Sequence, residues 1–134
     1  MVSARQPAMA DGHAPRVLVI DDDPSVRETV SSLLGALGYE CQTAADGQHG
    51  LIRFDEGGWD LVLTDLVMPT VNGWDVIEAI RRRAPTLPIV LITGLSDPAV
   101  IQRAREWRVP VIAKPFRLET LKATVVEALY AQIT

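Results

Sequence analysis

The sequence has little cysteine and few aromatic residues. Cys41 is the only cysteine among 134 residues, so no disulfide can form within the chain. A lone cysteine favours a reducing compartment. Phe, Trp and Tyr together make up 5% of the residues, against a hydrophobic fraction of 48%. A core must therefore be filled mainly by Val, Leu, Ile and Ala, and the hydrophobic fraction is sufficient for one.

A basic surface is lacking as well. The net charge is −4, and the longest basic run is Arg81-Arg82-Arg83. Because proteins meet nucleic-acid phosphates with a basic face, we expect no direct binding of nucleic acid. We interpret the three arginines as the solvated end of a helix, where positive charge is favourable.

Long apolar runs are absent too. No run approaches the roughly 20 residues that cross a bilayer, and the first 15 residues lack the apolar core of a signal peptide. We therefore expect a cytoplasmic protein without membrane contact. Residues 1–15 show no periodicity and are predicted to be a disordered tail. Residues 16–134 are predicted to form one domain, since their number fits one.

Short apolar runs alternate with amphipathic stretches from residue 16 onward. The continuous β-branched run at 17–20 predicts a parallel strand buried on both faces. Further strands are predicted at 39–44, 61–64, 89–92 and 109–113. Helical spacing predicts helices at 24–37, 46–56, 73–83, 98–107 and 118–133. Asp-Pro pairs before the first and fourth helices are typical of helix N-termini. Five such units predict an α/β fold, namely a doubly wound five-stranded parallel sheet with helices on both faces.

Polar side chains follow four of the five predicted strands. Asp21 and Asp22 follow the first strand, Asp65 the third, Thr93 the fourth and Lys114 the fifth. Ligands of open α/β sheets bind beyond the carboxyl ends of the strands. In a flavodoxin-like strand order, 2-1-3-4-5, the first and third strands are neighbours, and the three aspartates would then lie close together.

Three neighbouring carboxylates repel each other and favour a hard divalent cation such as Mg²⁺, which prefers oxygen ligands. Lys114 would add an ammonium and Thr93 a hydroxyl donor, so that the group could hold a tetrahedral dianion. An aspartate can act as the nucleophile in phosphoryl transfer. Asp65 stands singly at a strand end and is the best candidate for that nucleophile.

Four segments closely resemble the receiver domains of two-component response regulators. They are Val19-Ile20-Asp21-Asp22-Asp23-Pro24, the run from Leu63-Thr64-Asp65-Leu66-Val67-Met68-Pro69 to Gly73, Leu91-Ile92-Thr93-Gly94, and Ala113-Lys114-Pro115-Phe116. Each segment alone is a weak signal. Four such segments at four different strand ends, in the right order and with the right spacing, are a strong signal for this family. The resemblance covers residues from about 16 to 133.

The resemblance implies that Asp65 accepts a phosphoryl group from a phosphohistidine on a sensor histidine kinase or a histidine phosphotransfer protein. It implies Mg²⁺ as cofactor, held by Asp22, Asp65 and the backbone carbonyl of Val67. Asp21 would act mainly through a Mg²⁺-bound water.

Further residues of the resemblance have implied roles in the switch. Lys114 would pair with Asp65 before phosphorylation and with the phosphoryl group afterwards. Thr93 would move toward a phosphoryl oxygen, and Pro115 would follow a cis peptide bond.

The implied function is a phosphorylation-dependent signalling switch with slow self-dephosphorylation, which catalyses only its own phosphorylation and dephosphorylation. An unknown downstream protein would read the switch by contact, and a homodimer could form through residues 98–107, 109–113 and 118–133. Val111 stands where the family usually carries Tyr or Phe. This departure leaves open how the signal is transmitted.

Two other functions are disfavoured. A metal-dependent phosphatase with an aspartyl nucleophile would need a second carboxylate two residues after Asp65, where Val67 stands. A binding module without phosphorylation is disfavoured because all five site residues of the family are present. Whether the chain is a stand-alone regulator, a phosphorelay shuttle or part of a larger protein stays open.

Overall fold

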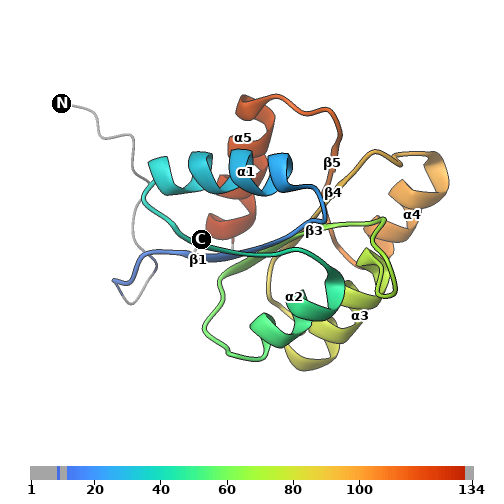
Figure 1. Cartoon of the computed structure of the whole chain (residues 1–134), viewed down its shortest axis with the longest axis horizontal. Helices are drawn as coiled ribbons and strands as arrows, with labels where there is room; N and C mark the ends of the chain where they lie inside the picture. Colours follow the sequence, from blue (N-terminus) through green and yellow to red (C-terminus); the bar gives the residue numbers. More distant parts are fainter. Residues whose placement is uncertain (1–8, 10–11, 132–134) are drawn as a thin grey trace.

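The computed structural model describes Met9 and residues 12–131, which include a five-stranded parallel sheet with helices on both faces (Figure 1). The strands are β1 (Arg16–Ile20), β2 (Glu40–Ala44), β3 (Leu61–Asp65), β4 (Ile89–Thr93) and β5 (Val111–Ala113). The helices are α1 (Pro24–Ala36), α2 (Gly47–Phe54), α3 (Gly73–Arg83), α4 (Pro98–Glu106) and α5 (Leu118–Tyr130). Most of the predicted tail, and the predicted helix end at residue 133, lie outside the described residues.

The sheet order is β2-β1-β3-β4-β5, which confirms the predicted fold and strand order. β1 pairs with β3 in parallel, and Ile20 lies opposite Thr64. Asp21 follows Ile20 and Asp65 follows Thr64, so both aspartates lie at the same edge of the sheet. Among the described helices, none is both long enough and apolar enough to span a bilayer.

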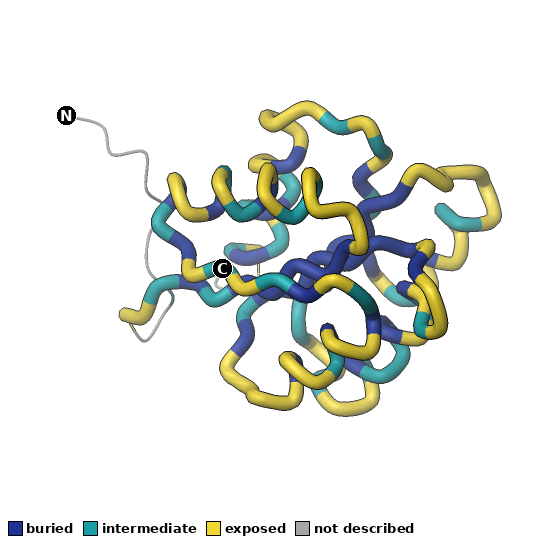
Figure 2. The backbone as a smooth tube through the Cα atoms, viewed as in Figure 1, coloured by how far each residue is buried: buried dark blue, intermediate teal, exposed yellow. Residues whose placement is uncertain are grey.

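Two apolar layers enclose the sheet, and its strands form the buried centre of the molecule (Figure 2). Alternate strand residues point to opposite faces. On one face, Leu18, Ile20 and Leu91 pack with side chains of α2, α3 and α4. On the other face, Val19 and Leu63 join side chains of α1 and α5. A strand that is covered by apolar layers on both faces consists almost entirely of apolar residues. Such strands could therefore be recognised in the sequence.

The helix N-termini confirm the predicted caps. Asp23 accepts a hydrogen bond from Ser25 N and Asp97 from Val100 N, each followed by a proline in the first helical turn. Glycine at position 50 lowers the helix propensity of α2, but close packing requires it there. A Cβ added at Gly50 would approach the Ile20 side chain to 2.5 Å, so glycine allows α2 to pack closely on β1.

Three local expectations need correction. β5 begins at Val111 and not at Val109, because Pro110 has no N–H to donate and Val109 N bonds to Ala104 O at the end of α4. Leu118 shares the predicted apolar stripe of α5, yet it is 51% exposed because it begins the helix beyond the core. Arg81 is not a solvated helix end like its two neighbours, since it is half-buried and donates to Leu87 O and to Trp107 O.

Candidate functional site

The carboxyl ends of β1 and β3 bring three carboxylates together. One carboxylate oxygen from each of Asp21, Asp22 and Asp65 lies within 4.8 Å of the other two. Asp21 is 1% exposed and Asp65 6% exposed, whereas Asp22 faces solvent. The predicted convergence of the three aspartates is therefore present, with two of them buried.

Lys114 supplies positive charge to this cluster from the end of β5. Its backbone N donates to Thr93 O at 2.8 Å, which fixes the loop after β5 against β4. Its Nζ lies 2.9 Å from Oδ2 of Asp21 and 3.3 Å from Oδ2 of Asp65. The Lys114–Pro115 peptide bond is cis, as the resemblance implied. One ammonium thus faces two buried carboxylates, with a third carboxylate nearby.

Burial and neighbouring charges together shift the pKa values of Asp65 and Lys114. Burial and the neighbouring charge of Asp21 raise the pKa of Asp65, against the opposing effects of Lys114 and of the Leu66 N–H. Burial lowers the pKa of Lys114, but the carboxylates of Asp21 and Asp65 outweigh burial and raise it above its ordinary value. Lys114 therefore stays charged, while the cluster carries an excess of negative charge.

Backbone amides hold one oxygen of each buried carboxylate. Oδ1 of Asp21 accepts from Asp23 N at 2.9 Å, and Oδ1 of Asp65 accepts from Leu66 N at 2.8 Å. The orientation of both carboxylates is therefore fixed by the chain itself. The second oxygen of each is the one that faces Lys114.

The residues fit a bound Mg²⁺. Oδ2 of Asp21 is buried and accepts no hydrogen bond with favourable geometry from the described residues. Its close neighbour is Nζ of Lys114, with which it forms an ion pair. Such an oxygen has a free lone pair for a metal-bound water or a cation. Asp22 and Asp65 add carboxylate oxygens, the ligands that Mg²⁺ prefers, and the exposure of Asp22 leaves room for its retained waters.

Gly73 positions the end of β3 by close backbone contact. Its N donates to Leu66 O at 2.7 Å. A Cβ at this position would clash with the backbone of Asp65 and Leu66. The glycine at the end of the second resembling segment therefore lets α3 begin directly beside the Asp65 backbone.

Thr93 is part of the site through its backbone, while its hydroxyl is engaged elsewhere. The side chain is buried, and Oγ1 accepts from Leu95 N at 2.9 Å. No contact is described between this hydroxyl and the side chains of Asp65 or Lys114. Val67, whose carbonyl was predicted to bind the metal, lies in the β3–α3 loop with its side chain 56% exposed, and that ligand role stays a prediction.

Sequence reasoning missed one residue that supports the site. Nη1 of Arg27 donates to the backbone oxygen of Asp21 at 2.7 Å. Arg27 lies near the N-terminus of α1, where positive charge is unfavourable for the helix dipole. A basic residue at such a position, four residues after the acidic run that ends at Asp23, is a signal that could have indicated the contact.

The comparison with protein families places the response regulator receiver domain model on residues 17–126. The sensor histidine kinase RcsC of Salmonella typhimurium is 37% identical over 117 residues, which are 87% of this chain. This chain spans only 12% of the length of that kinase.

Two solved structures share the fold and the sequence pattern. The chemotaxis protein CheY4 of Vibrio cholerae has a TM-score of 0.81 and 32% identity, over 87% of this chain and 99% of that chain. The response regulator protein TrrA of Thermotoga maritima, solved in complex with Mg²⁺–BeF, has a TM-score of 0.78 and 34% identity. The match to TrrA covers 86% of this chain and 99% of that chain.

Proposed function

This chain belongs to the family of response regulator receiver domains, and from that membership we propose that it is a phosphorylation switch whose phosphate acceptor is Asp65. Receiver domains of two-component systems are phosphorylated on aspartate and bind Mg²⁺ in an acidic pocket. The observation that carries the proposal is the convergence of Asp65 with Asp21, Asp22 and Lys114 at one edge of the sheet.

The proposed reaction is transfer of a phosphoryl group from a phosphohistidine donor. A carboxylate oxygen of Asp65 attacks the phosphorus, a P–O bond forms, and the P–N bond of the donor breaks. The imidazole keeps the electron pair of that bond and takes up a proton. Slow self-dephosphorylation is the attack of water on the same phosphorus, which breaks the P–O bond to Asp65 and releases inorganic phosphate.

The chain's own residues orient this reaction. Leu66 N holds Oδ1 of Asp65, which leaves Oδ2 turned toward Lys114. Asp22, Asp65 and the Val67 carbonyl would hold Mg²⁺, with Asp21 acting through a metal-bound water. When bound, Mg²⁺ supplies positive charge that stabilises the phosphoryl oxygens in the transition state.

Phosphorylation changes the charge of the site and so its preferred conformation. It adds about −1.5 to −2 charges and three acceptor oxygens. Lys114, now 3.3 Å from Asp65, would bind a phosphoryl oxygen. The Thr93 hydroxyl would exchange its bond from Leu95 N for donation to the phosphoryl group. These changes bias an equilibrium between conformations that a partner reads.

The proposed context is a cytoplasmic two-component system. Receiver domains partner with histidine kinases, and a sensor histidine kinase is among the relatives of this chain. We propose a sensor histidine kinase or a histidine phosphotransfer protein as donor, and a downstream protein as reader of the switch. We further propose residues 16–134 as the receiver domain, preceded by a disordered tail at 1–15, and dimerisation through α4, β5 and α5 as one route of output.

The test is the intact mass of the chain after incubation with acetyl phosphate, with and without Mg²⁺. We expect one added phosphoryl group that requires Mg²⁺ and is absent from Asp65→Asn. Asp23→Asn is the matched control, because Asp23 is exposed and asparagine caps helices equally well.

A phosphoryl group on the Asp65→Asn variant would refute Asp65 as acceptor. A wild-type chain that stays unmodified both by acetyl phosphate and by a phosphorylated histidine kinase or phosphotransfer protein would refute the switch.

A further inference from the structure

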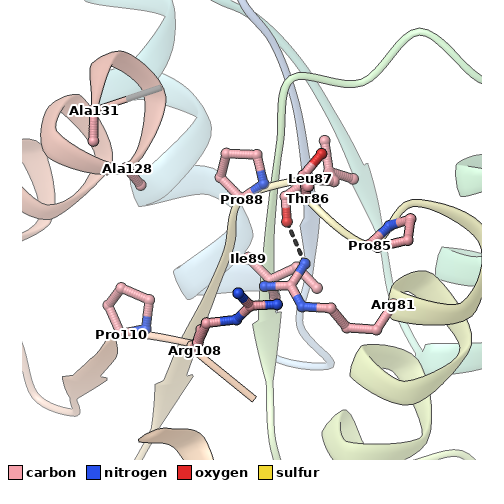
Figure 3. A pocket seen from close by; sticks show the side chains of 10 residues that line it. All are labelled: Arg81, Pro85, Thr86, Leu87, Pro88, Ile89, Arg108, Pro110, Ala128 and Ala131. Carbon is pink, nitrogen blue, oxygen red and sulfur yellow. Dashed lines mark hydrogen bonds between the residues drawn. The ribbon is translucent and has the colours of Figure 1, made fainter. Parts of the chain in front are cut away.

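A cavity of about 530 Å³ lies at the edge of the sheet opposite to Asp65 (Figure 3). It is bounded by the segment that leads into β4, by the turn before β5 and by the C-terminal ends of α3 and α5. Because all strands are parallel, this is the amino end of the sheet, and Asp65 is at the carboxyl end. The proposed phosphorylation makes no use of this cavity.

Two arginines face the cavity, and no carboxylate of the described residues pairs with them. Figure 3 shows the side chains of Arg81 and Arg108 directed into it. Among the described residues, no acidic residue lines the cavity, and neither arginine forms an ion pair. Burial and the neighbouring charge of Arg108 lower the pKa of Arg81. Two positive charges thus lie close together, with no acidic side chain of the described residues between them.

The Arg81 guanidinium is oriented by the backbone. It donates to Leu87 O, as the dashed line in Figure 3 shows, and its Nε donates to Trp107 O at 3.4 Å. These bonds occupy two of its five N–H donors. The other donors of Arg81, and the side-chain donors of Arg108, form no hydrogen bond with the rest of the described chain, so they can bind a ligand.

The backbone of Arg108 is in the left-handed region, with a φ of 58°. Residues with a Cβ avoid this region, and glycine adopts it without strain. The chain therefore carries an arginine at a position where glycine would be the relaxed choice. That strained turn directs the Arg108 side chain toward the cavity and toward Arg81.

Apart from Thr86, the other described residues of the lining are apolar. Pro85, Pro88, Pro110 and Ile89 line the cavity beside the two arginines. Its volume is in the range of about 300–1,000 Å³ that is typical of small-molecule sites. Paired guanidinium groups bind phosphate and carboxylate through parallel N–H donors. An anionic head with an apolar body therefore matches both parts of the lining.

We propose that this cavity binds a small organic anion, whose phosphate or carboxylate lies between Arg81 and Arg108 and whose apolar part packs on the prolines. The proposal goes beyond the phosphorylation switch and does not depend on it.

The test is a titration of the ¹⁵N-labelled full chain followed by NMR, in buffer without Mg²⁺, with phenyl phosphate, benzoate and inorganic phosphate as probes. We expect saturable shifts of the backbone amides of Leu87, Ile89 and Arg108, and none at Leu66 beside Asp65. The tighter of the two aromatic probes identifies the preferred head group. Inorganic phosphate should bind at least tenfold more weakly than phenyl phosphate.

Arg108→Gly is the decisive variant, because glycine suits the left-handed backbone and the fold should be retained. We expect its affinity for the aromatic probes to fall at least tenfold. Arg105→Gln is the matched control: it removes one positive charge from an exposed position on α4 that does not line the cavity, and it should bind like wild type.

Three results would overturn the proposal. They are the absence of saturable shifts at Leu87, Ile89 and Arg108 with both aromatic probes, equal weakening by Arg108→Gly and Arg105→Gln, and equal affinity for inorganic phosphate and phenyl phosphate.

Discussion

The two ends of the sheet carry opposite charges that are held in different ways. At the carboxyl end, Asp21 and Asp65 are buried, and backbone amides fix one oxygen of each. At the amino end, Arg81 is half-buried and Arg108 exposed, and both come from segments outside the strands. The two carboxylates at the carboxyl end are thus buried and held by the backbone, whereas the arginines at the amino end are half-buried or exposed.

This difference indicates where charge matters for stability. Charges removed from water interact strongly, and loss of one partner leaves the other unpaired. Exposed charges are screened, and their pairwise effects are small. The stability of the carboxyl end should therefore respond strongly to a change of charge at or beside its buried carboxylates, and that of the amino end mainly to its backbone conformation.

The largest effect is expected for Lys114→Met, which keeps the length of the side chain and removes its charge. Asp21 and Asp65 lose the ammonium that lies 2.9 Å and 3.3 Å from their Oδ2 atoms. We expect the free energy of unfolding to fall by about 2–3 kcal/mol at pH 7 without Mg²⁺. Added Mg²⁺ should recover part of the loss. Urea unfolding with and without Mg²⁺ measures both effects.

Lys122→Met is the control for this prediction, since Lys122 is an exposed lysine on α5. Its replacement should change the free energy of unfolding by less than about 0.5 kcal/mol. Equal losses for the two variants would show that the buried carboxylates do not depend on Lys114, and the contrast between the two ends would fail.

A smaller effect is expected for Asp22→Asn, which tests the exposed member of the acidic cluster. Loss of one carboxylate ligand should weaken Mg²⁺ binding by about tenfold or more, or roughly 1.4 kcal/mol. Stability without Mg²⁺ should hardly change, because Asp22 faces solvent. Calorimetric titration with Mg²⁺ measures the affinity, with Asp23→Asn as control. Wild-type affinity in Asp22→Asn would exclude this residue as a ligand.

The fold and the acidic cluster were predictable because parallel topology converts strand ends into neighbours. Asp21, Asp65 and Lys114 follow strands that read clearly as apolar runs, so their convergence needed only the strand order. The cis bond before Pro115 came from the resemblance alone. The positions of Asp21, Asp65 and Lys114 are set by the ends of the strands and not by the detailed path of a loop.

Features set by loop conformation were not predictable. The Thr93 hydroxyl accepts from Leu95 N, a bond that depends on the turn after β4. Arg81 differs from the next two arginines because the carbonyl groups of Leu87 and Trp107 lie within its reach. Trp107 is distant in the sequence, so the run of arginines contains no sign of this contact. The late start of β5 could have been anticipated from Pro110.

The smallest effect is expected for Arg108→Gly. This variant should be more stable than wild type, whereas Lys114→Met at the carboxyl end should be less stable. A left-handed conformation costs a residue with a Cβ about 1–2 kcal/mol. Glycine removes that cost, while the greater freedom of the unfolded chain takes back about 0.5–1 kcal/mol. We therefore expect a net gain of about 0.5–1 kcal/mol in the free energy of unfolding, measured by urea unfolding.

Arg105→Gly makes this last comparison decisive. Arg105 lies near the end of α4 and is exposed, so both variants remove one arginine from neighbouring positions. Glycine within a helix costs about 1 kcal/mol, so Arg105→Gly should be less stable than wild type. A higher free energy of unfolding for Arg108→Gly, beside a lower one for Arg105→Gly, would show that the Arg108 backbone is strained and that its side chain does not stabilise the fold. Equal losses would mean that the Arg108 side chain stabilises the fold, and the amino end would then resemble the carboxyl end in its dependence on charge.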